Sequence, residues 1–592
     1  MSIIVQKFGG TSVADSQKIL AAARKAIRAQ MDGHQVVVVV SAMGKNTDVL
    51  VQLAREITEV PSAREMDMLL STGEQVSVAL MAMAVHSLGH EAISLTGAQI
   101  GIVTDSTHTR ARIHSISTER IQRALDEGRI VIAAGFQGVD EVGNITTLGR
   151  GGSDTTAVAL AAVLGAEVCE IYTDVDGVYT ADPRVVPEAR RLARISYDEM
   201  LELASMGAGV MHGRSIEFAK KFSVPVHVRS SFSDSVGTVI GAEPEAPGQP
   251  VCGAALMRHE ARITVIGVPD RPGAALTVFS RIAARNVTMD MIVQNVGSRG
   301  TADISLTVPR DDLPATMKAI EEAVHDLGAG SFSYDDDVSK ISVVGLGMAT
   351  QPGVARRMFR TLGERGINIQ MITTGQIKLS VLLDHEHSQE ALRLLHHAFG
   401  LEEVPPLPEV APELTVRSGG PVAAANAVAR MQSMEELMIG GIDLDESQAR
   451  LTLADVPDRP GLAAAVFEEV AAGGIVVDMI VQSIGRAGKA GLSFTIPRED
   501  LDRGLALAGA IAKRLGCPPP AHCPEVAKLS VTGIGMRSHT GVARRMFQTL
   551  SRTGVNIDMI STSEVQVNVV VDAKMGRKSH SALQQEFAEV IV

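Results

Sequence analysis

Cysteine is scarce in this chain of 592 residues, and its four cysteines are widely scattered. They are too few to form a disulfide framework. Cys517 and Cys523 flank a proline run and His522, but two thiols and one imidazole leave a tetrahedral zinc site short of a ligand. We therefore expect no metal site built from protein ligands alone.

Long apolar runs and clusters of basic residues are also missing. No stretch approaches the roughly 18 apolar residues of a membrane span, and 68 acidic against 55 basic residues give a formal charge of −13. An acidic chain without Lys/Arg blocks does not favour a nucleic-acid surface. The sequence enters a predicted strand at once, without a signal peptide. We expect a cytoplasmic protein that binds neither membranes nor nucleic acids.

Two common signatures of phosphate-handling enzymes are absent as well. The chain has neither Gly-x-x-x-x-Gly-Lys-Ser/Thr nor the catalytic-loop motif of protein kinases. A nucleotide site in this chain must therefore be built in another way.

Strands and helices alternate through the first 240 residues. Five apolar stretches are typical of buried strands. They cover residues 3–7, 36–40, 92–95, 130–134 and 168–173. Helices are expected at 16–30 and 155–164. Two more are expected around residues 71–74, one before this motif and one after it. The alternation predicts a three-layer αβα domain with a mainly parallel sheet, and the chain is long enough for several further domains.

Four polar loops follow predicted strands of this domain. They span residues 7–12, 41–48, 149–154 and 173–176. Because ligands of parallel α/β sheets bind beyond the carboxyl ends of the strands, these loops are expected to converge on one site.

The glycine-rich loop at residues 148–157 has the character of an anion site. Three glycines and Arg150 precede Ser153 and Asp154, residue types that cap helix starts. Backbone N–H groups, the positive end of a helix dipole and a guanidinium would meet there. The alternative is a tight strand-to-helix turn without a ligand.

Two further clusters favour phosphoryl transfer. Gly9 and Gly10 let the backbone approach a phosphate, and Lys7 supplies a point charge for the transferring group. Residues 173–184 offer carboxylates, a tyrosine and a guanidinium for a nucleotide with its metal, although the Asp-Val-Asp-Gly part is equally compatible with an ordinary polar loop. Together the clusters make phosphoryl transfer the favoured reaction class.

The second half of the chain is a repeat. Residues 268–273 recur at 456–461, and residues 353–359 recur at 541–547, both at an offset of 188. Within each unit a second offset of 80 relates Gly273 to Gly353. We predict four copies of a small α+β module, ordered ββαββα or βαββαβ, that resembles the ACT type and pairs edge to edge.

These patterns divide the chain into seven segments. The αβα domain would occupy residues 1–235, the modules 251–336, 337–401, 438–524 and 525–592, and the linkers 236–250 and 402–437.

Five motifs resemble those of aspartate kinases in order and spacing. They are Lys-Phe-Gly-Gly-Thr-Ser at 7–12, Ser-Ala-Met-Gly at 41–44 with Thr47 and Asp48, Ser-Thr-Gly-Glu at 71–74, and residues 148–156 and 173–184. The resemblance covers essentially the whole chain, repeats included. It implies an amino-acid-kinase fold and transfer of the γ-phosphoryl group of ATP, with Mg²⁺, to the side-chain carboxylate of L-aspartate. The product, 4-phospho-L-aspartate, opens lysine, threonine and methionine synthesis.

The resemblance also assigns roles to residues of the site. Lys7 would stabilise charge on the transferred phosphoryl group, Asp154 would order Lys7 or the substrate, and Arg150 would pair with the substrate α-carboxylate. The other substrate-binding residues would be Ser41, Thr47, Glu74, Gly152 and Ser153. The nucleotide would be held by Lys7, Gly9, Gly10, Thr173, Asp174, Tyr179, Asp182 and Arg184.

The chain departs from the family pattern near residues 206–214. Gly209 stands where many members have a lysine that would reach toward ATP, and Gly213 stands where they have a proline. The rest of the site matches, so we expect an active enzyme whose nucleotide site lacks this cation.

The repeats resemble amino-acid-sensing ACT pairs, with lysine, threonine or both as effectors. The Asp-Arg-Pro-Gly turns at 270–273 and 458–461 would expose backbone N–H groups at the start of a helix. Such N–H groups suit the carboxylate of an amino acid. The expected contacts are Asp270, Gly273, Ala274, Ala275, Gln294, Asn368, Ile369, Asp458, Gly461, Gln482, Asn556 and Ile557. The alternative is modules that only pair structurally; in either case ACT pairing is expected to build a homodimer or larger assembly.

Two other functions fit parts of the pattern. The first is a related kinase that acts on glutamate or uridylate. The Ser-Thr-Gly-Glu motif and the ACT repeats argue against it, because such a kinase would need neither. A non-catalytic amino-acid sensor would not need Lys7, Arg150 and Asp154. A fused homoserine dehydrogenase is not expected, because the sequence ends within the fourth module without a dinucleotide fingerprint.

Overall fold

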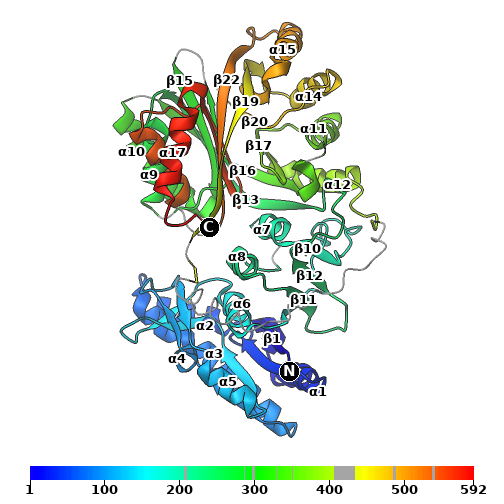
Figure 1. The fold of residues 1–592 in the computed structure, drawn as a ribbon, viewed down its shortest axis with the longest axis vertical. Coiled ribbons are helices and arrows are strands. Elements are labelled where there is room, and N and C mark those ends of the chain that lie inside the picture. Colours follow the sequence, from blue (N-terminus) through cyan, green and yellow to red (C-terminus); the bar gives the residue numbers. More distant parts are fainter. Residues whose placement is uncertain are drawn as a thin grey trace.

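The computed structural model describes residues 1–205, 210–285, 287–296, 300–328, 330–349, 351, 353–405, 434–435, 437–484, 488–536 and 541–591. An α/β domain forms the lower part of the molecule in Figure 1, and a ring of strands covered by helices forms the upper part. This division agrees with the predicted fold class, an αβα domain followed by α+β modules.

The main sheet of the N-terminal domain has eight strands in the order β10-β12-β11-β9-β1-β2-β6-β3. All neighbours are parallel except β11 and β12. The strands are β1 (Ile3–Phe8), β2 (Gln35–Val40), β3 (Ala92–Leu95), β6 (Ile130–Ala134), β9 (Val168–Thr173), β10 (Arg194–Ser196), β11 (Val226–Ser230) and β12 (Thr238–Gly241). A smaller sheet holds β4 (Ile102–Thr104), β5 (Ile113–Ile116), β7 (Gln137–Val139) and β8 (Ile145–Thr147).

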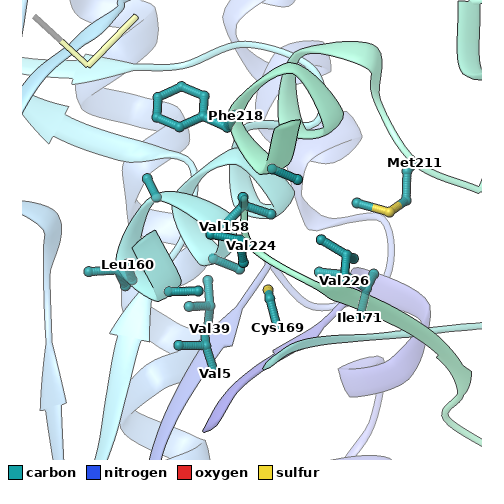
Figure 2. Packing of buried hydrophobic residues seen from close by; sticks show 14 of the residues in the cluster. Val5, Val39, Val158, Leu160, Cys169, Ile171, Met211, Phe218, Val224 and Val226 are labelled. Carbon is teal, nitrogen blue, oxygen red and sulfur yellow. The ribbon is translucent and has the colours of Figure 1, made fainter. Parts of the chain in front are cut away.

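Helices cover both faces of the main sheet. They are α1 (Ser16–Met31), α2 (Asn46–Ile57), α3 (Ala63–Ser87), α4 (Gly97–Ile100), α5 (Glu119–Asp126), α6 (Gly152–Leu164), α7 (Tyr197–Ser205) and α8 (Gly213–Phe222). The valines of β2 show why the sheet is central. Val36 and Val38 pack into a cluster with α1 and α3, whereas Val37 and Val39 pack into the opposite cluster with α6 and α8, part of which Figure 2 shows. The predicted burial of this strand on both faces is confirmed.

The Ser-Thr-Gly-Glu motif does not lie between two helices, as the sequence predicted, but inside the single long helix α3. Its hydroxyl groups do not interrupt the helix, because Ser71 donates to the carbonyl of Met68 and Thr72 to that of Leu69. Gly73 is required by packing, since a Cβ there would lie 2.8 Å from the Cβ of Ala42. Within the described residues, α3 is also the one helix long and apolar enough to cross a membrane, and half of its apolar window is buried in the fold.

Helix α6 begins earlier than predicted. Its first residue is Gly152, and the preceding Gly151 is the cap, with a left-handed backbone (φ 69°). Ser153 and Asp154 therefore lie in the first turn of the helix and do not cap it. The positive φ of Gly151 is a conformation that glycine adopts without steric cost, which explains why the cap is glycine.

The C-terminal half forms a closed ring of strands in the order β13-β15-β14-β23-β24-β22-β19-β21-β20-β17-β18-β16. The first unit holds β13 (Gly253–Pro269), β14 (Ile292–Val296), β15 (Thr301–Pro309), β16 (Ser331–Val344), β17 (Met371–Thr374) and β18 (Lys378–Asp384). The second holds β19 (Met438–Pro457), β20 (Ile480–Ile484), β21 (Lys489–Pro497), β22 (Ala521–Ile534), β23 (Met559–Thr562) and β24 (Gln566–Asp572).

Helices cover the outside of this ring on two sides (Figure 1). They are α9 (Ala274–Ala283), α10 (Leu313–Leu327), α11 (Val354–Glu364), α12 (Ser388–Ala398), α14 (Leu462–Ala472), α15 (Leu501–Leu515), α16 (Gly541–Arg552) and α17 (Gly576–Glu586). The predicted edge-to-edge pairing takes place within one chain. Module 1 pairs with module 4 through β14 and β23, and module 2 pairs with module 3 through β17 and β20. The ring therefore leaves no strand edge for the expected dimer.

Two expected boundaries, 336/337 and 524/525, fall inside strands. The first part of β13, residues 253–257, pairs with module 2, whereas its later part pairs with β15 of module 1. Strand β16 likewise continues across residues 336 and 337, and β19 and β22 repeat this arrangement. The expected linker 236–250 contains β12, which belongs to the main sheet. Most of the other linker, residues 406–433 and 436, lies outside the described residues.

Gly363 sets how closely modules 2 and 3 approach, because a Cβ there would lie 2.9 Å from the Cα of Gly461. We predict that Gly363→Val lowers the free energy of unfolding by about 1–3 kcal/mol through overpacking. Urea denaturation followed by circular dichroism measures the change. The equivalent position of the other pair is Ser551, so Ser551→Ala is the matched control and should change stability by less than about 0.5 kcal/mol. Equal effects of the two substitutions would contradict this account.

Candidate active site and effector sites

The loops after β1 and β2 meet at the carboxyl edge of the main sheet. The N–H of Gly44 donates to the carbonyl of Gly10 at 3.0 Å. A Cβ on Gly10 would lie 2.8 Å from the carbonyl oxygen of Ala42, so only glycine permits this approach. The predicted convergence of strand-end loops is present at this edge.

Lys7 and Asp154 form the central ion pair of the site. The Nζ of Lys7, at the end of β1, lies 2.6 Å from Oδ1 of Asp154, in the first turn of α6. Both side chains are nearly buried, where solvent screens charges only weakly. The pair aims a fixed positive charge at the edge of the sheet where an anionic group would bind.

Glu74 reaches the same edge from α3. Its Oε1 accepts the N–H of Ala42 at 3.0 Å, and its Oε2 is buried without a hydrogen-bond partner in the described part of the chain. Burial raises the pKa of Glu74 to about 7, although the Ala42 N–H opposes the shift. A buried carboxylate with a free oxygen beside Ser41 suits a ligand ammonium group.

The glycine-rich loop, which leads into the helix that carries Asp154, brings Arg150 to the surface. Gly149 and Gly151 have positive φ, and Arg150 between them is exposed. Its guanidinium has no partner among the residues that the structure describes, so it is available to a carboxylate. Ser153 packs against the end of β6, where a Cβ on Gly135 would lie 2.7 Å from its Oγ.

The predicted nucleotide segment is held by its own side chains. Tyr179 donates to Asp176 at 2.7 Å. Arg184 binds Asp182 through two nitrogens, at 2.9 and 2.8 Å, and these hydrogen bonds lower the pKa of Asp182. Thr173 and Asp174 follow β9, which pairs with β1, so this segment begins at the same edge of the sheet as Lys7.

The structure does not connect two further positions of the sequence analysis to this arrangement. Thr47 is in the first turn of α2 and makes no side-chain hydrogen bond to another predicted site residue in the described ranges. Gly209 lies outside the described residues. Gly213 is the first residue of α8, a position where proline is favoured, so the family proline and this glycine are both compatible with the local fold.

Sequence reasoning missed Asp67, which is fully buried in α3. Its carboxylate accepts from the N–H of Thr109 at 3.0 Å and the hydroxyl of Thr147 at 2.5 Å, and it contacts His108. A Cβ on Gly149 would lie 3.0 Å from the carbonyl oxygen of Thr109. Because Asp67 holds Thr109 in place, it also supports the glycine-rich loop that packs on Thr109. The signal in the sequence was one acidic residue among the Met and Leu residues of an apolar helix.

The predicted effector residues come together in two pockets between modules. Asn556 of module 4 donates to Asp270 of module 1 at 2.6 Å, and Asn368 of module 2 donates to Asp458 of module 3 at 2.9 Å. The first pocket is about 360 Å³ and the second about 200 Å³. The first is lined by residues that include Gly273, Ala274, Ala275, Gln294 and Ile557, and the second by residues that include Ile369, Gly461 and Gln482.

The strand ring touches the N-terminal domain beside the predicted nucleotide segment. Lys378 of module 2 binds Glu202 of α7 at 2.7 Å, with both side chains buried. The hydroxyl of Thr180 lies 2.9 Å from Nε2 of His396, and Arg393 donates to the carbonyl of Val185 at 2.7 Å. A shift of module 2 would therefore move the segment that carries Tyr179 and Arg184.

Among the described residues, no three His, Cys, Asp or Glu side chains gather in a possible metal site.

Comparison with known proteins agrees with this architecture. Residues 2–230 match the amino acid kinase family, and residues 262–325, 341–399 and 529–587 match ACT domains. The protein is thus a kinase of the amino-acid-kinase fold with ACT modules. An aspartokinase from Geobacillus stearothermophilus is 51% identical over 404 residues, which are 68% of this chain and 98% of that protein. The chain belongs to the aspartokinase family, whose members transfer the γ-phosphoryl group of ATP to aspartate.

Two solved structures extend the comparison. An aspartate kinase from Synechocystis is 38% identical in sequence and superposes with a TM-score of 0.52. The match covers 99% of this chain and 98% of the Synechocystis chain. Aspartokinase III of E. coli, in complex with aspartate and ADP, is 27% identical with a TM-score of 0.58, over 67% of this chain and 99% of its own. The Geobacillus alignment leaves 188 residues of this chain unmatched, the same number as the repeat offset. The extra length is therefore equal to one repeat period, which is one pair of modules together with its linker.

We predict that Lys7→Ala lowers kcat at least about 100-fold, because Lys7 faces charge that develops in the transition state. Initial rates with ATP and aspartate give kcat, and equilibrium dialysis gives aspartate affinity, which should change little. Lys18→Ala is the control, since Lys18 pairs with Asp15 on the exposed side of α1. A Lys7→Ala rate close to wild type would contradict the assignment.

We predict that the KM for aspartate rises about tenfold between pH 8 and pH 6, as Glu74 with a pKa of about 7 becomes protonated. Steady-state kinetics across this range, at saturating ATP, measures the trend. Because the folded pKa is raised, Glu74 should also make the protein less stable as pH rises from 4.5 through 7. Glu74→Gln should flatten both profiles, and a pH-dependent KM in that variant would assign the effect to another group.

Proposed function

We propose that this chain phosphorylates the side-chain carboxylate of L-aspartate with ATP, through the residues that meet at the carboxyl edge of the main sheet. The observation that carries the proposal is the combination of the Lys7–Asp154 ion pair with the free, buried oxygen of Glu74 and the exposed Arg150. Arg150 binds the α-carboxylate of aspartate and Glu74 binds its ammonium group. The side-chain carboxylate is left to face the phosphoryl donor.

The chemistry needs no general base. The aspartate carboxylate is ionised at neutral pH, so its oxygen attacks the γ-phosphorus directly and the bond to the ADP oxygen breaks. Lys7 stabilises the charge on the transferred group, and Asp154 holds Lys7 in place. The loop at Gly9 and Gly10 lets the phosphates approach the backbone, because neither residue has a side chain in the way. The N–H of Gly9 itself donates to the carbonyl of Tyr172 at 3.3 Å.

The nucleotide is proposed to bind along residues 173–184. Thr173 and Asp174 lie at the sheet edge, and Tyr179, Asp182 and Arg184 form the outer wall. Mg²⁺ would enter with the phosphates of ATP and neutralise their charge. Asp154, a carboxylate at the same edge of the sheet, is already paired with Lys7.

The regulatory ring is proposed to bind lysine, threonine or both in the two intermodular pockets. Each pocket presents an asparagine and a glutamine beside a helix start, groups that suit the charged ends of an amino acid. Each asparagine donates to an aspartate, which is Asp270 in the lining of the first pocket and Asp458 outside the lining of the second. E. coli aspartokinase III has been solved in complex with lysine and aspartate in a T-state, which supports an amino-acid effector here. Any homodimer would use a surface other than the ring edges.

We place the enzyme in the cytoplasm, and the four unpaired cysteines fit a reducing compartment.

The direct test of the proposed activity is an assay of ADP release with ATP, Mg²⁺ and each of aspartate, glutamate and uridylate as acceptor, with lysine and threonine added singly and together. Turnover with aspartate alone, trapped as the hydroxamate of the acyl phosphate, supports the proposal. Turnover with another acceptor, or none, would overturn it.

We predict that Asp270→Ala and Asp458→Ala relieve effector inhibition, while the uninhibited rate stays unchanged. Each loses the contact that its asparagine partner makes across a pocket, and the coupling at stake is of the order of 1–3 kcal/mol. The pockets differ in size, so one substitution should relieve inhibition more than the other. Inhibition curves for both amino acids measure this, with Asp326→Ala, in an exposed ion pair of module 1, as the control. Unchanged curves in both variants would leave the modules a purely structural role.

A further inference from the structure

Two residues of the linker between the regulatory units are anchored in the kinase domain. Met434 is 1% exposed and belongs to the hydrophobic cluster around the main sheet, and its N–H donates to the carbonyl of His114. The Glu435 carboxylate accepts from Nε of Arg214 at 2.8 Å and from the N–H of Ile113 at 2.9 Å. Met434 and Glu435 are called the anchor below.

Arg214 connects the anchor to the glycine-rich loop. While Nε and Nη2 bind Glu435, Nη1 donates to the carbonyl of Leu148 at 2.5 Å and Nη2 to that of Ala111 at 2.7 Å. Leu148 immediately precedes the loop that carries Arg150. The start of α8 touches this loop a second time, because a Cβ on Gly151 would lie 2.3 Å from the Cβ of His212.

Glu435 is the group that fixes Arg214 in this role. The two side chains are only 9% and 12% exposed, and a guanidinium buried without its carboxylate is strongly unfavourable. The planar fork of arginine binds a carboxylate and two carbonyls at once only in one orientation. Loss of Glu435 would therefore let Arg214 turn toward solvent and release Leu148.

The anchor is also joined to the ring by a very short tether. Glu436 and Leu437 are the only residues between Glu435 and Met438, the first residue of β19. Three peptide steps span at most about 11 Å. Leu437 is buried in the cluster shared by modules 1 and 4, and Met438 pairs with Ile534 of β22. A displacement of the second unit away from the kinase domain must therefore reach Glu435.

We propose that Glu435 is a positioning residue for the substrate loop, acting through Arg214, and that it couples the second regulatory unit to aspartate binding. The proposal rests on the proposed binding of aspartate by Arg150. It differs from the contacts of module 2 with residues 180–185, which reach the nucleotide segment. The anchor thus carries the effect of the second unit to the acceptor side of the reaction, in addition to the contact that the N–H of Glu564 in module 4 makes with Glu202 of α7 at 3.2 Å.

The positioning role is tested with Glu435→Ala and Glu435→Gln in the full chain. Glu435→Ala should raise the KM for aspartate about tenfold or more and leave the KM for ATP within about twofold, and Glu435→Gln, which keeps one acceptor oxygen, should give a smaller rise. Glu586→Ala removes a more exposed ion pair with Arg545 in module 4, far from Arg214 in sequence, and should change neither KM. If Glu435→Ala fails to fold, Glu435→Gln decides the question.

An unchanged aspartate KM in both Glu435 variants, or equal rises in both KM values with a lowered Tm, would overturn the positioning role. A wild-type enzyme that does not turn over aspartate would instead overturn the proposed function. The coupling is tested by inserting six Gly/Ser residues between Glu436 and Leu437, which leaves the anchor contacts in place but lengthens the tether. This insertion should keep the aspartate KM and weaken inhibition by lysine and threonine at least about threefold. Unchanged inhibition, or a wild-type enzyme that neither amino acid inhibits, would remove the coupling.

Discussion

Closure of the strand ring is the constraint on which the regulatory half depends. A small sheet with helices on one face has two strand edges, and each exposed edge offers unpaired N–H and carbonyl groups. The four modules satisfy these edges by pairing 1 with 4 and 2 with 3, and the long strands β13, β16, β19 and β22 run from one module into the next. No module can shift without moving its neighbours in the ring.

This rigidity explains how a pocket between two modules can influence a distant active site. An effector changes activity only if it binds one arrangement of the ring better than another. The ring meets the kinase domain at buried polar contacts, among them Lys378–Glu202 and Thr180–His396. Burial raises the pKa of Glu202 while Lys378 opposes the shift, so a separation of the two would remove the cation that compensates this buried carboxylate. Such contacts favour a switch between distinct positions of the ring over a gradual movement of the ring on the kinase domain.

The sequence was sufficient for the parts of the molecule that follow from local pattern. The five valines of β2 and the strand-end glycines predict a buried parallel sheet with a site at its edge, and the offset of 188 predicts two regulatory units. The same pattern could not locate Asp67 or Glu435, because the partners of both residues are distant in sequence: Thr147 is 80 residues from Asp67, and Arg214 is 221 residues from Glu435. The Ser-Thr-Gly-Glu motif suggested an interruption between helices, since packing of Gly73 on Ala42 is a tertiary contact that propensity does not reveal.

The presence of both units in one chain has a consequence for how the two pockets can evolve. In a symmetric dimer of identical subunits, a two-fold axis makes both copies of an interface the same, and each substitution appears twice. Here the pseudo-symmetric partners are encoded separately, so Ser551 faces Gly273 in one pair while Gly363 faces Gly461 in the other. A single substitution therefore tunes one pocket and leaves its counterpart unchanged, which gives this chain two independently adjustable inputs.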